Sequence, residues 1–358
     1  MRIYLVSDYN ALLNPTYPNC STPEPSYPKY NGSYYIKNQA DADDLLGCTA
    51  FWGDIVVSEC SSEVTSITLK DLKTINDGVL YVEHCNKLQN FSAPVLESIE
   101  SAMSFLNLSS LTDIQLPLLR SVGGQFLRVS DAPLLSTLAI SLDSGFTAGI
   151  LIENTGLSTI KLHPKSANTR KRDEGDDYFP GNAYPLTIVS NPNLDEILVT
   201  GYEFNDVNIS NNRPSHINLP SLVACQSLYI SSAASLYVPS LEQVRGDLSI
   251  VNSLMTNLSL PVLKLVEKDM LIAKNTLLRY FWASIQARGS WPFADLSTQI
   301  SENPLLSKIS LKDLVIAYGR TQIFNNPSLS SLELWSLKSP EYMWISGNFS
   351  RYEKPAKI

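Results

Sequence analysis

Histidines and cysteines are the residue types that most often bind metals or act as nucleophiles, and this chain holds few of them. It has three histidines, His84, His163 and His216, and five cysteines among 358 residues, and no two of these lie at the spacing of zinc ligands. His84 precedes Cys85, and adjacent residues of a strand point to opposite faces, which argues against a Cys–His dyad. Gly-rich phosphate loops and Gly-x-Ser-x-Gly elbows are missing from the sequence. We therefore expect no metal, no cofactor and no nucleophilic active site.

Paired carboxylates are the remaining arrangement that could make this chain an enzyme. β-Helical enzymes that cleave polysaccharides have coils of about the length seen here, so this possibility must be weighed. A glycoside hydrolase needs two carboxylates up to about 9.5 Å apart. In the repeat described below the outward acidic residues are Glu83 and Glu153, three coils and roughly 14 Å apart. The acidic pairs at 43–44 and 176–177 fall in a cap and a loop. A β-helix carbohydrate-active enzyme is therefore only the third hypothesis.

A short repeat that runs along almost the whole chain supplies the elements that would position such residues. Each repeat has an apolar anchor inside a β-like run, an Asn or small residue three positions later, and then a Leu. Most anchors lie 20 to 25 residues apart, which is typical of leucine-rich solenoids with one strand per coil. One coil cannot bury its apolar face alone, so the coils must stack. The anchors are Val57, Val82, Phe105, Val129, Ile152, Ile188, Ile209, Ile230, Ile250, Ile272, Ile300, Ile323 and Ile345.

Two further rows share this register. Five residues after the Pro of a recurrent Pro-x-Leu phrase comes an apolar residue that should begin the next strand, and at Cys225 this residue is expected to be a buried thiol. This second row contains Ile99, Val122, Cys225, Val244 and Val266. The third residue after each anchor should point inward, where a buried Asn amide can satisfy backbone groups of its own and the neighbouring coil. These ladder asparagines are Asn191, Asn212, Asn275, Asn303, Asn326 and Asn348.

Together these patterns predict a mainly β fold, a right-handed parallel β solenoid of about thirteen coils over residues 30–350, with a short N-terminal cap helix. Residues 1–29 would be a poorly ordered extension and 351–358 a tail. Two segments interrupt the repeat. We predict an exposed charged loop at 163–184. The aromatic-rich segment 279–295 is predicted to be a side hairpin packed on the solenoid, with a partner-docking patch as the alternative.

Four of the cysteines can be interpreted by position. Cys60 and Cys85 hold the ladder position of consecutive coils, about 4.8 Å apart, so they could form a disulfide or remain two buried thiols. Cys20 and Cys48 flank the helical-looking segment 39–46. A disulfide between them would seal the open end of the first coil.

Composition excludes some partners. The net charge of −8 and the pI near 5.0 argue against nucleic acid, and no apolar run is long enough for a transmembrane helix. Seven Asn-x-Ser/Thr acceptors occur, somewhat more than chance predicts, which favours secretion. Asn348 lies on the inward ladder, so we expect it to be buried and unmodified. The candidate glycosylation sites are Asn31, Asn90, Asn107, Asn208 and Asn257.

The residues on either side of the anchors should form the outward face of the main sheet. They include Tyr81, Arg128, Tyr229, Gln322 and Trp344. Aromatic rings have an apolar body and often a polar tip, so such a face could make broad contact with glycan or protein. The alternative is that these side chains are ordinary surface packing.

The N-terminal part also resembles a known family. It looks like the opening of receptor L-domains, and more closely it is similar to fungal GPI-anchored cell-wall organisation proteins. The resemblance covers roughly residues 30–350 and implies a secreted, lipid-anchored protein that supports wall integrity without a catalytic centre. Its implied partners are cell-wall polysaccharide or surface proteins. The matching phrases are Gly32-Ser33-Tyr34, Gln39-Ala40-Asp41, Leu46-Gly47-Cys48-Thr49, Gly53-Asp54-Ile55-Val56-Val57, Leu96-Glu97-Ser98-Ile99, Leu119-Arg120-Ser121-Val122-Gly123 and Asn326-Pro327-Ser328-Leu329.

The first hypothesis is thus a non-enzymatic, extracellular glycoprotein of the cell surface or wall that presents a rigid solenoid surface. The second is an untethered, secreted glycan- or protein-binding module. It is suggested by the ends of the chain, because residues 1–20 are not a typical secretory signal and residues 352–358 offer no hydrophobic tail for a lipid anchor.

Overall fold

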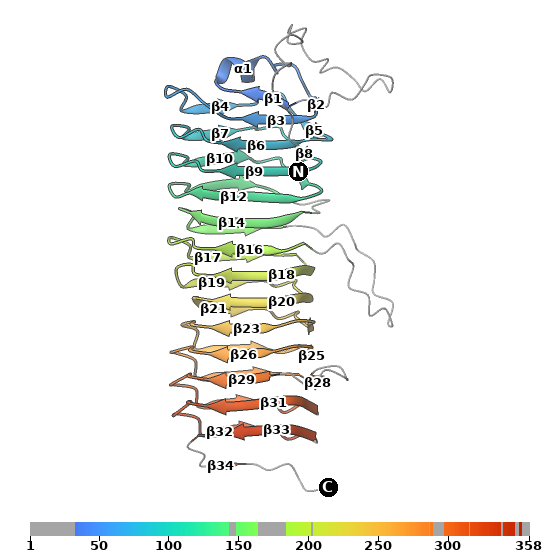
Figure 1. Ribbon diagram of the computed structural model, residues 1–358, viewed down its shortest axis with the longest axis vertical. Coiled ribbons are helices and arrows are strands. Elements are labelled where there is room, and N and C mark those ends of the chain that lie inside the picture. Colours follow the sequence, from blue (N-terminus) through green and yellow to red (C-terminus); the bar gives the residue numbers. More distant parts are fainter. Residues whose placement is uncertain are drawn as a thin grey trace, which may run out of the picture.

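The protein is an elongated stack of parallel coils, with β1 near one end and β33 near the other (Figure 1). Because successive strands pair side by side with parallel neighbours, the fold is a β solenoid, as predicted. The computed structural model describes residues 33–142, 148–163, 184–201, 203–285, 287–288, 297–314, 316–337, 339–347 and 351–352.

One face of the stack is a continuous parallel sheet, here called the main ladder, and it contains all thirteen predicted anchors. From Val57 to Ile345, each anchor is the direct partner of the anchor in the next coil. Ile36 pairs with Val57 and adds one earlier strand that the repeat does not reveal. The strands of the main ladder are β1 (Ser33–Ile36), β3 (Asp54–Val57), β6 (Val79–Glu83), β9 (Ala102–Leu106), β12 (Phe126–Ala132), β14 (Gly149–Thr155), β16 (Leu186–Val189), β18 (Glu203–Ser210), β20 (Ala224–Ser231), β23 (Leu248–Val251), β26 (Met270–Ala273), β29 (Ser297–Ser301), β31 (Ile316–Phe324) and β33 (Ser339–Ile345).

Two further sets of parallel strands complete the coils. The second set carries the predicted second row, in which Ile99 pairs with Val122, and Val244 pairs with both Cys225 and Val266. Its short strands β2 (Ala50–Trp52), β5 (Thr74–Asn76), β8 (Ser98–Ile99) and β11 (Ser121–Val122) form a separate sheet. The strands β22 (Gln243–Val244), β25 (Leu265–Val266) and β28 (Ala287–Arg288) belong to the same sheet as the main ladder, because β22 pairs with β20 and β28 pairs with β31. The third face consists of β4 (Ser66–Thr68), β7 (Asn90–Ser92), β10 (Asp113–Leu116), β13 (Thr137–Ile140), β15 (Thr159–Leu162), β17 (Glu196–Val199), β19 (Ser215–Asn218), β21 (Ala233–Tyr237), β24 (Asn257–Leu260), β27 (Tyr280–Ala283), β30 (Lys308–Ser310), β32 (Ser331–Glu333) and β34 (Arg351–Tyr352).

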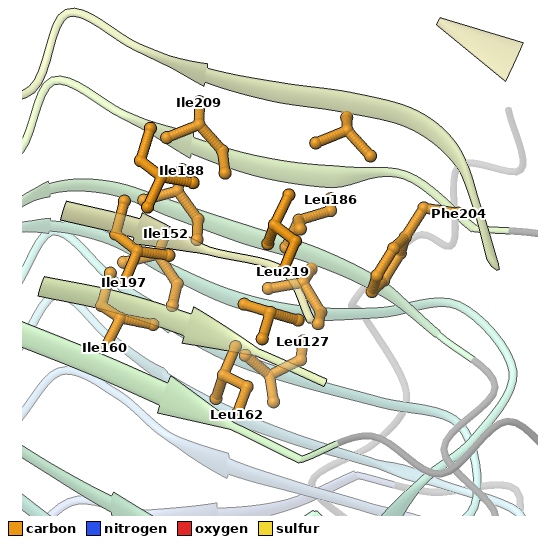
Figure 2. Packing of buried hydrophobic residues seen from close by; sticks show 14 of the residues in the cluster. Leu127, Ile152, Ile160, Leu162, Leu186, Ile188, Ile197, Phe204, Ile209 and Leu219 are labelled. Atoms are coloured by element: carbon orange, nitrogen blue, oxygen red, sulfur yellow. The ribbon is translucent and has the colours of Figure 1, made fainter. Parts of the chain in front are cut away.

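A single apolar core runs between these faces. Ile152 and Ile188 of the main ladder lie near Ile160 and Ile197 of the third face (Figure 2). All four side chains are buried. Burial of one such side chain contributes roughly 1.5–3 kcal/mol, so the stacked anchors are the main source of stability.

Each coil turns just after its anchor through a residue in the left-handed conformation, which the repeat pattern does not reveal. The second residue after the anchor has φ between 50° and 60° in twelve consecutive coils, from Glu59 to Asn325. This turn lets the following residue point into the core. Asn and Asp tolerate the conformation better than other non-glycine residues. They occupy it at Asn107, Asp131, Asn154, Asn211, Asn252 and Asn325.

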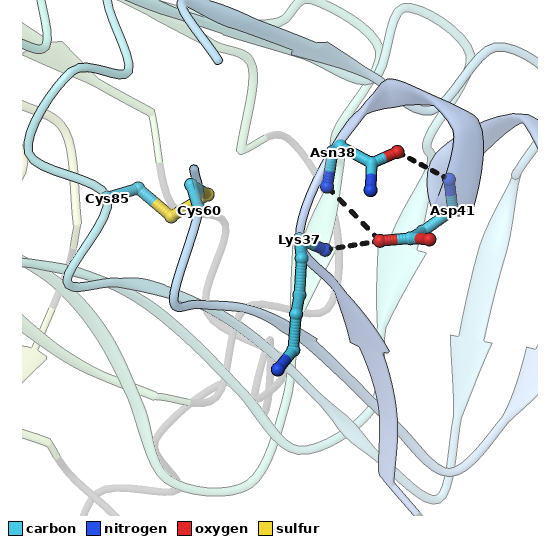
Figure 3. The surroundings of a disulfide bond; sticks show 5 residues. All are labelled: Lys37, Asn38, Asp41, Cys60 and Cys85. Carbon is cyan, nitrogen blue, oxygen red and sulfur yellow. Dashed lines mark hydrogen bonds between the residues drawn. A yellow bond between two sulfur atoms is a disulfide. The ribbon is translucent and has the colours of Figure 1, made fainter. Parts of the chain in front are cut away.

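A short helix covers the first coil, as predicted. The helix α1 spans Gln39–Asp43 and begins with a capping box. The Asn38 side chain accepts from the backbone N–H of Ala40 at 2.8 Å, and Asp41 Oδ2 accepts from the Asn38 N–H at 3.2 Å. Figure 3 shows Asn38 and Asp41 facing each other. Because Ala42 packs into the core, the helix closes an end that would otherwise be open.

Two predictions about segments are wrong where the structure describes them. Residues 280–283 of the predicted side hairpin form β27, a regular strand paired in parallel with β24 and β30. Residues 351–352 of the predicted tail form β34, which pairs with β32. The predicted extension 1–29 lies outside the described residues, as do 164–183 of the charged loop and 353–358 of the tail.

Candidate binding surface on the main ladder

The outward side chains of the main ladder form columns along the solenoid axis. One column contains the residue before each anchor, and the strand register makes its members direct neighbours. The predicted outward residues therefore do share one face. This column consists of Tyr35, Val56, Tyr81, Ser104, Arg128, Leu151, Thr187, Asn208, Tyr229, Ser249, Leu271, Gln299, Gln322 and Trp344.

The two outward carboxylates of the predicted face stay apart. In the column after the anchors, Leu106 and Ser130 lie between Glu83 and Glu153, which places the acids three strand spacings, or about 14 Å, from each other. That exceeds the usual spacing of the paired carboxylates in glycoside hydrolases. Within the part of the chain that the structure describes, no cluster of three or more His, Cys, Asp or Glu residues could hold a metal ion.

Aromatic side chains gather at two places on this face. Near the N-terminus, the rings of Tyr81 and Phe126 are parallel within 2°, with centroids 6.4 Å apart. Near the C-terminus, the rings of Phe324 and Trp344 stack at 5.3 Å and 12°. The repeat identifies three of these residues as outward but not Phe126, which lies three positions before its anchor.

The surroundings of Tyr81 keep its hydroxyl protonated. Burial raises the pKa of Tyr81 above its ordinary value, and the nearby Asp54 and Glu83 carboxylates add to the shift. A protonated phenol can donate a hydrogen bond to a sugar hydroxyl.

The ladder asparagines point into the core, where their role is structural. Asn303 Nδ2 donates to the carbonyl of Ile272 at 3.0 Å, and Asn303 Oδ1 accepts from the backbone N–H of Asn275 at 3.0 Å. The same arrangement joins Asn191 to Asn212. The side chain of Asn348, predicted to be buried, lies outside the described residues.

The cysteines stabilise the first coils. Cys60 and Cys85 form a disulfide with a Cα–Cα distance of 5.0 Å, which decides between the two predicted alternatives (Figure 3). Cys48 is also disulfide-bonded, and its predicted partner, Cys20, lies outside the described residues. Cys225 is a buried free thiol as predicted, and burial raises its pKa, so it is not a reactive nucleophile.

The candidate glycosylation sites differ in exposure. Asn90, Asn107 and Asn257 are exposed, the first and last of them on the third face and Asn107 in a left-handed turn. Asn208 is half-buried in β18, and its Oδ1 accepts from the Ser210 hydroxyl at 2.7 Å. Asn31 lies outside the described residues.

Three curated fungal proteins are similar to this chain. The cell wall protein ecm33 of Schizosaccharomyces pombe is 23% identical over 65% of this chain and 52% of its own length. Protein ecm33 of Aspergillus fumigatus is 28% identical over 66% of this chain and 61% of its own length. A cell surface GPI-anchored protein of Arthroderma benhamiae is 27% identical over 84% of this chain and 66% of its own length. The chain thus spans about half to two-thirds of these relatives.

These relatives confirm the predicted resemblance to fungal cell-wall and GPI-anchored surface proteins. No family model matches the chain, and no solved structure matches it. The receptor L-domain part of the resemblance therefore stays a prediction. None of the described helices is long and apolar enough to cross a membrane.

Proposed function

We propose, on the premise that this chain is a homologue of fungal cell-wall and cell-surface proteins, that it is an extracellular, non-enzymatic glycoprotein of the fungal surface or wall. Its role would be to support wall organisation by presenting a rigid face to wall polymers. The observation that carries the proposal is the continuous main ladder, in which anchors from Val57 to Ile345 pair without a break. Such a ladder holds outward side chains at fixed intervals over a long distance.

The proposal of a non-enzymatic role is supported by the separation of Glu83 and Glu153. If the chain were nevertheless a glycosidase, incubation with wall polysaccharides would release reducing ends, and Glu83→Gln or Glu153→Gln would abolish the release. We expect no release from the unmodified protein. Release that depends on either acid would overturn the non-enzymatic assignment.

Disruption of the native gene tests the wall role. We expect the mutant to be hypersensitive to dyes and enzymes that perturb the wall, and we expect the tagged protein in the wall or membrane fraction. Recovery only from the culture medium would favour the second hypothesis, an untethered binding module. A mutant with normal wall resistance and an intracellular protein would overturn both hypotheses.

A further inference from the structure

We propose that the main ladder of the first five coils binds an extended β-1,4-linked polysaccharide such as chitin, which runs along the solenoid axis. The contact is assigned to Tyr35, Tyr81 and Phe126, here called the aromatic column, together with Arg128. The inference rests on the proposed wall role and deepens it by naming a polymer and the residues that contact it.

The spacing of the aromatic column is the first argument. Tyr35 and Tyr81 are separated by Val56, and Tyr81 and Arg128 are separated by Ser104. Phe126 lies on the same strand as Arg128, two residues earlier. Tyr35 and Tyr81 therefore occupy the same column two coils apart, which at ~4.8 Å per strand gives an interval of about 9.6 Å. The Phe126 ring stacks on the Tyr81 ring and enlarges the aromatic area at that position. In an extended β-1,4-linked chain successive sugar rings face opposite ways, so the same ring face recurs after two sugars, over a similar length.

The shape of the surface is the second argument. Val56 and Ser104, which separate the aromatic residues, are both at most 8% exposed, so neither stands above the rings. Tyr35 is 57% exposed, and the parallel rings of Tyr81 and Phe126 lie 6.4 Å apart. The result is a low surface with one aromatic area at Tyr35 and a larger one at the stacked Tyr81 and Phe126 rings. The C–H groups of a sugar ring can pack against such area.

Polar groups beside the aromatic column are the third argument. The Nε atom of Arg128 is buried and has no hydrogen-bond partner among the described residues. That atom has almost no accessible surface, so the contact with the polymer is assigned to the other guanidinium N–H groups of half-buried Arg128, which can donate to a sugar hydroxyl or acetamide carbonyl. The Glu83 carboxylate, half-buried on the neighbouring column, can accept from a sugar hydroxyl. With Asp54 and Glu83 both nearby, the surface favours a neutral polymer over an anionic one.

The rest of the face does not repeat this arrangement. Tyr229 is 39% exposed, but its neighbours in the column are Asn208 and Ser249. Phe324 and Trp344 lie on adjacent coils and stack on each other, so their rings do not have the two-coil interval. Tyr229 is therefore a matched control, because it occupies the same column position on the same sheet.

The test is a binding isotherm of the full chain on insoluble chitin, with insoluble β-1,3-glucan particles as the comparison polymer. We expect saturable binding to chitin and at least tenfold weaker binding to β-1,3-glucan. Tyr35→Ala and Tyr81→Ala should each weaken chitin binding about tenfold, whereas Tyr229→Ala should leave it unchanged. Arg128→Gln, which removes the guanidinium group, should also weaken binding.

Circular dichroism melts of every variant ensure that a loss of binding is not a loss of fold, and exposed Tyr35 is the safest position for this purpose. No chitin binding, or equal losses in the Tyr35 and Tyr229 variants, would overturn the assignment. So would equal affinity for the two polymers. The proposed wall role would survive these results, because gene disruption and cell fractionation test it separately.

Discussion

Replacing Asn303 with alanine should destabilise the solenoid more than any surface substitution. Asn303 Oδ1 accepts from the backbone N–H and from Nδ2 of Asn275, at 3.0 and 3.1 Å. Its Nδ2 lies within hydrogen-bonding distance of the carbonyls of Ile272 and Ser301 and of Asn326 Oδ1, at 2.9–3.2 Å. The substitution removes all five contacts and leaves the buried Asn275 N–H without its acceptor.

Because the Nδ2 group has two hydrogens, the five contacts correspond to four full hydrogen bonds, and four bonds at ~0.5–1.5 kcal/mol each correspond to about 2–6 kcal/mol of unfolding free energy. Urea denaturation followed by circular dichroism measures the loss. Asn86→Ala is the matched control, because Asn86 is exposed and lies in a turn, and it should change stability by less than about 0.5 kcal/mol. A loss below about 1 kcal/mol for the Asn303 variant would refute the idea that the asparagine ladder joins the coils.

Three further predictions concern the first coils and the third face. Cys60→Ala/Cys85→Ala should lower the unfolding free energy by roughly 2–4 kcal/mol, since the disulfide closes a sequence separation of 25 residues; an unchanged urea midpoint would contradict this. Phe281→Ala should lower the unfolding free energy by about 3–5 kcal/mol because Phe281 is buried, whereas Trp282→Ala on the outer side of the same strand should lower it much less. Equal losses for the two variants would favour the predicted side hairpin over the strand. Because the folded-state pKa of Tyr81 is raised, its contribution to stability is complete below about pH 10 and declines as the pH rises further. An ultraviolet titration should therefore show a late-titrating phenol that Tyr81→Phe removes.

The repeat can be predicted from sequence because each anchor must bury an apolar side chain at the same point of its coil. That requirement alone determines the register from Val57 to Ile345, and the strand pairing follows it at every coil. The strand β1 is not predicted from the repeat because the third residue after Ile36 is Gln39. This residue begins α1 and does not occupy the ladder position.

The other misses have local causes. The left-handed turn is not predicted because half of its positions hold residues such as Glu59 and Lys274, which do not favour that conformation. The segment around β27 is misread because its many aromatic residues obscure a simple alternation, with Phe281 inside and Tyr280 and Trp282 outside. The candidate surface needs side-chain positions as well as the strand register, because the register aligns Tyr81 with Arg128 and only the ring contact brings Tyr81 beside Phe126.

The most direct test of the account is rescue of wall resistance in a strain that lacks the native gene. The intact gene with its own flanking sequence is reintroduced as wild type, as Tyr229→Ala and as Tyr35→Ala/Tyr81→Ala, and growth is measured on a wall-perturbing dye at equal protein abundance. We expect the wild type and the Tyr229 variant to restore growth and the double variant to fail. Full rescue by the double variant would contradict the claim that the outward face of the first coils carries the function.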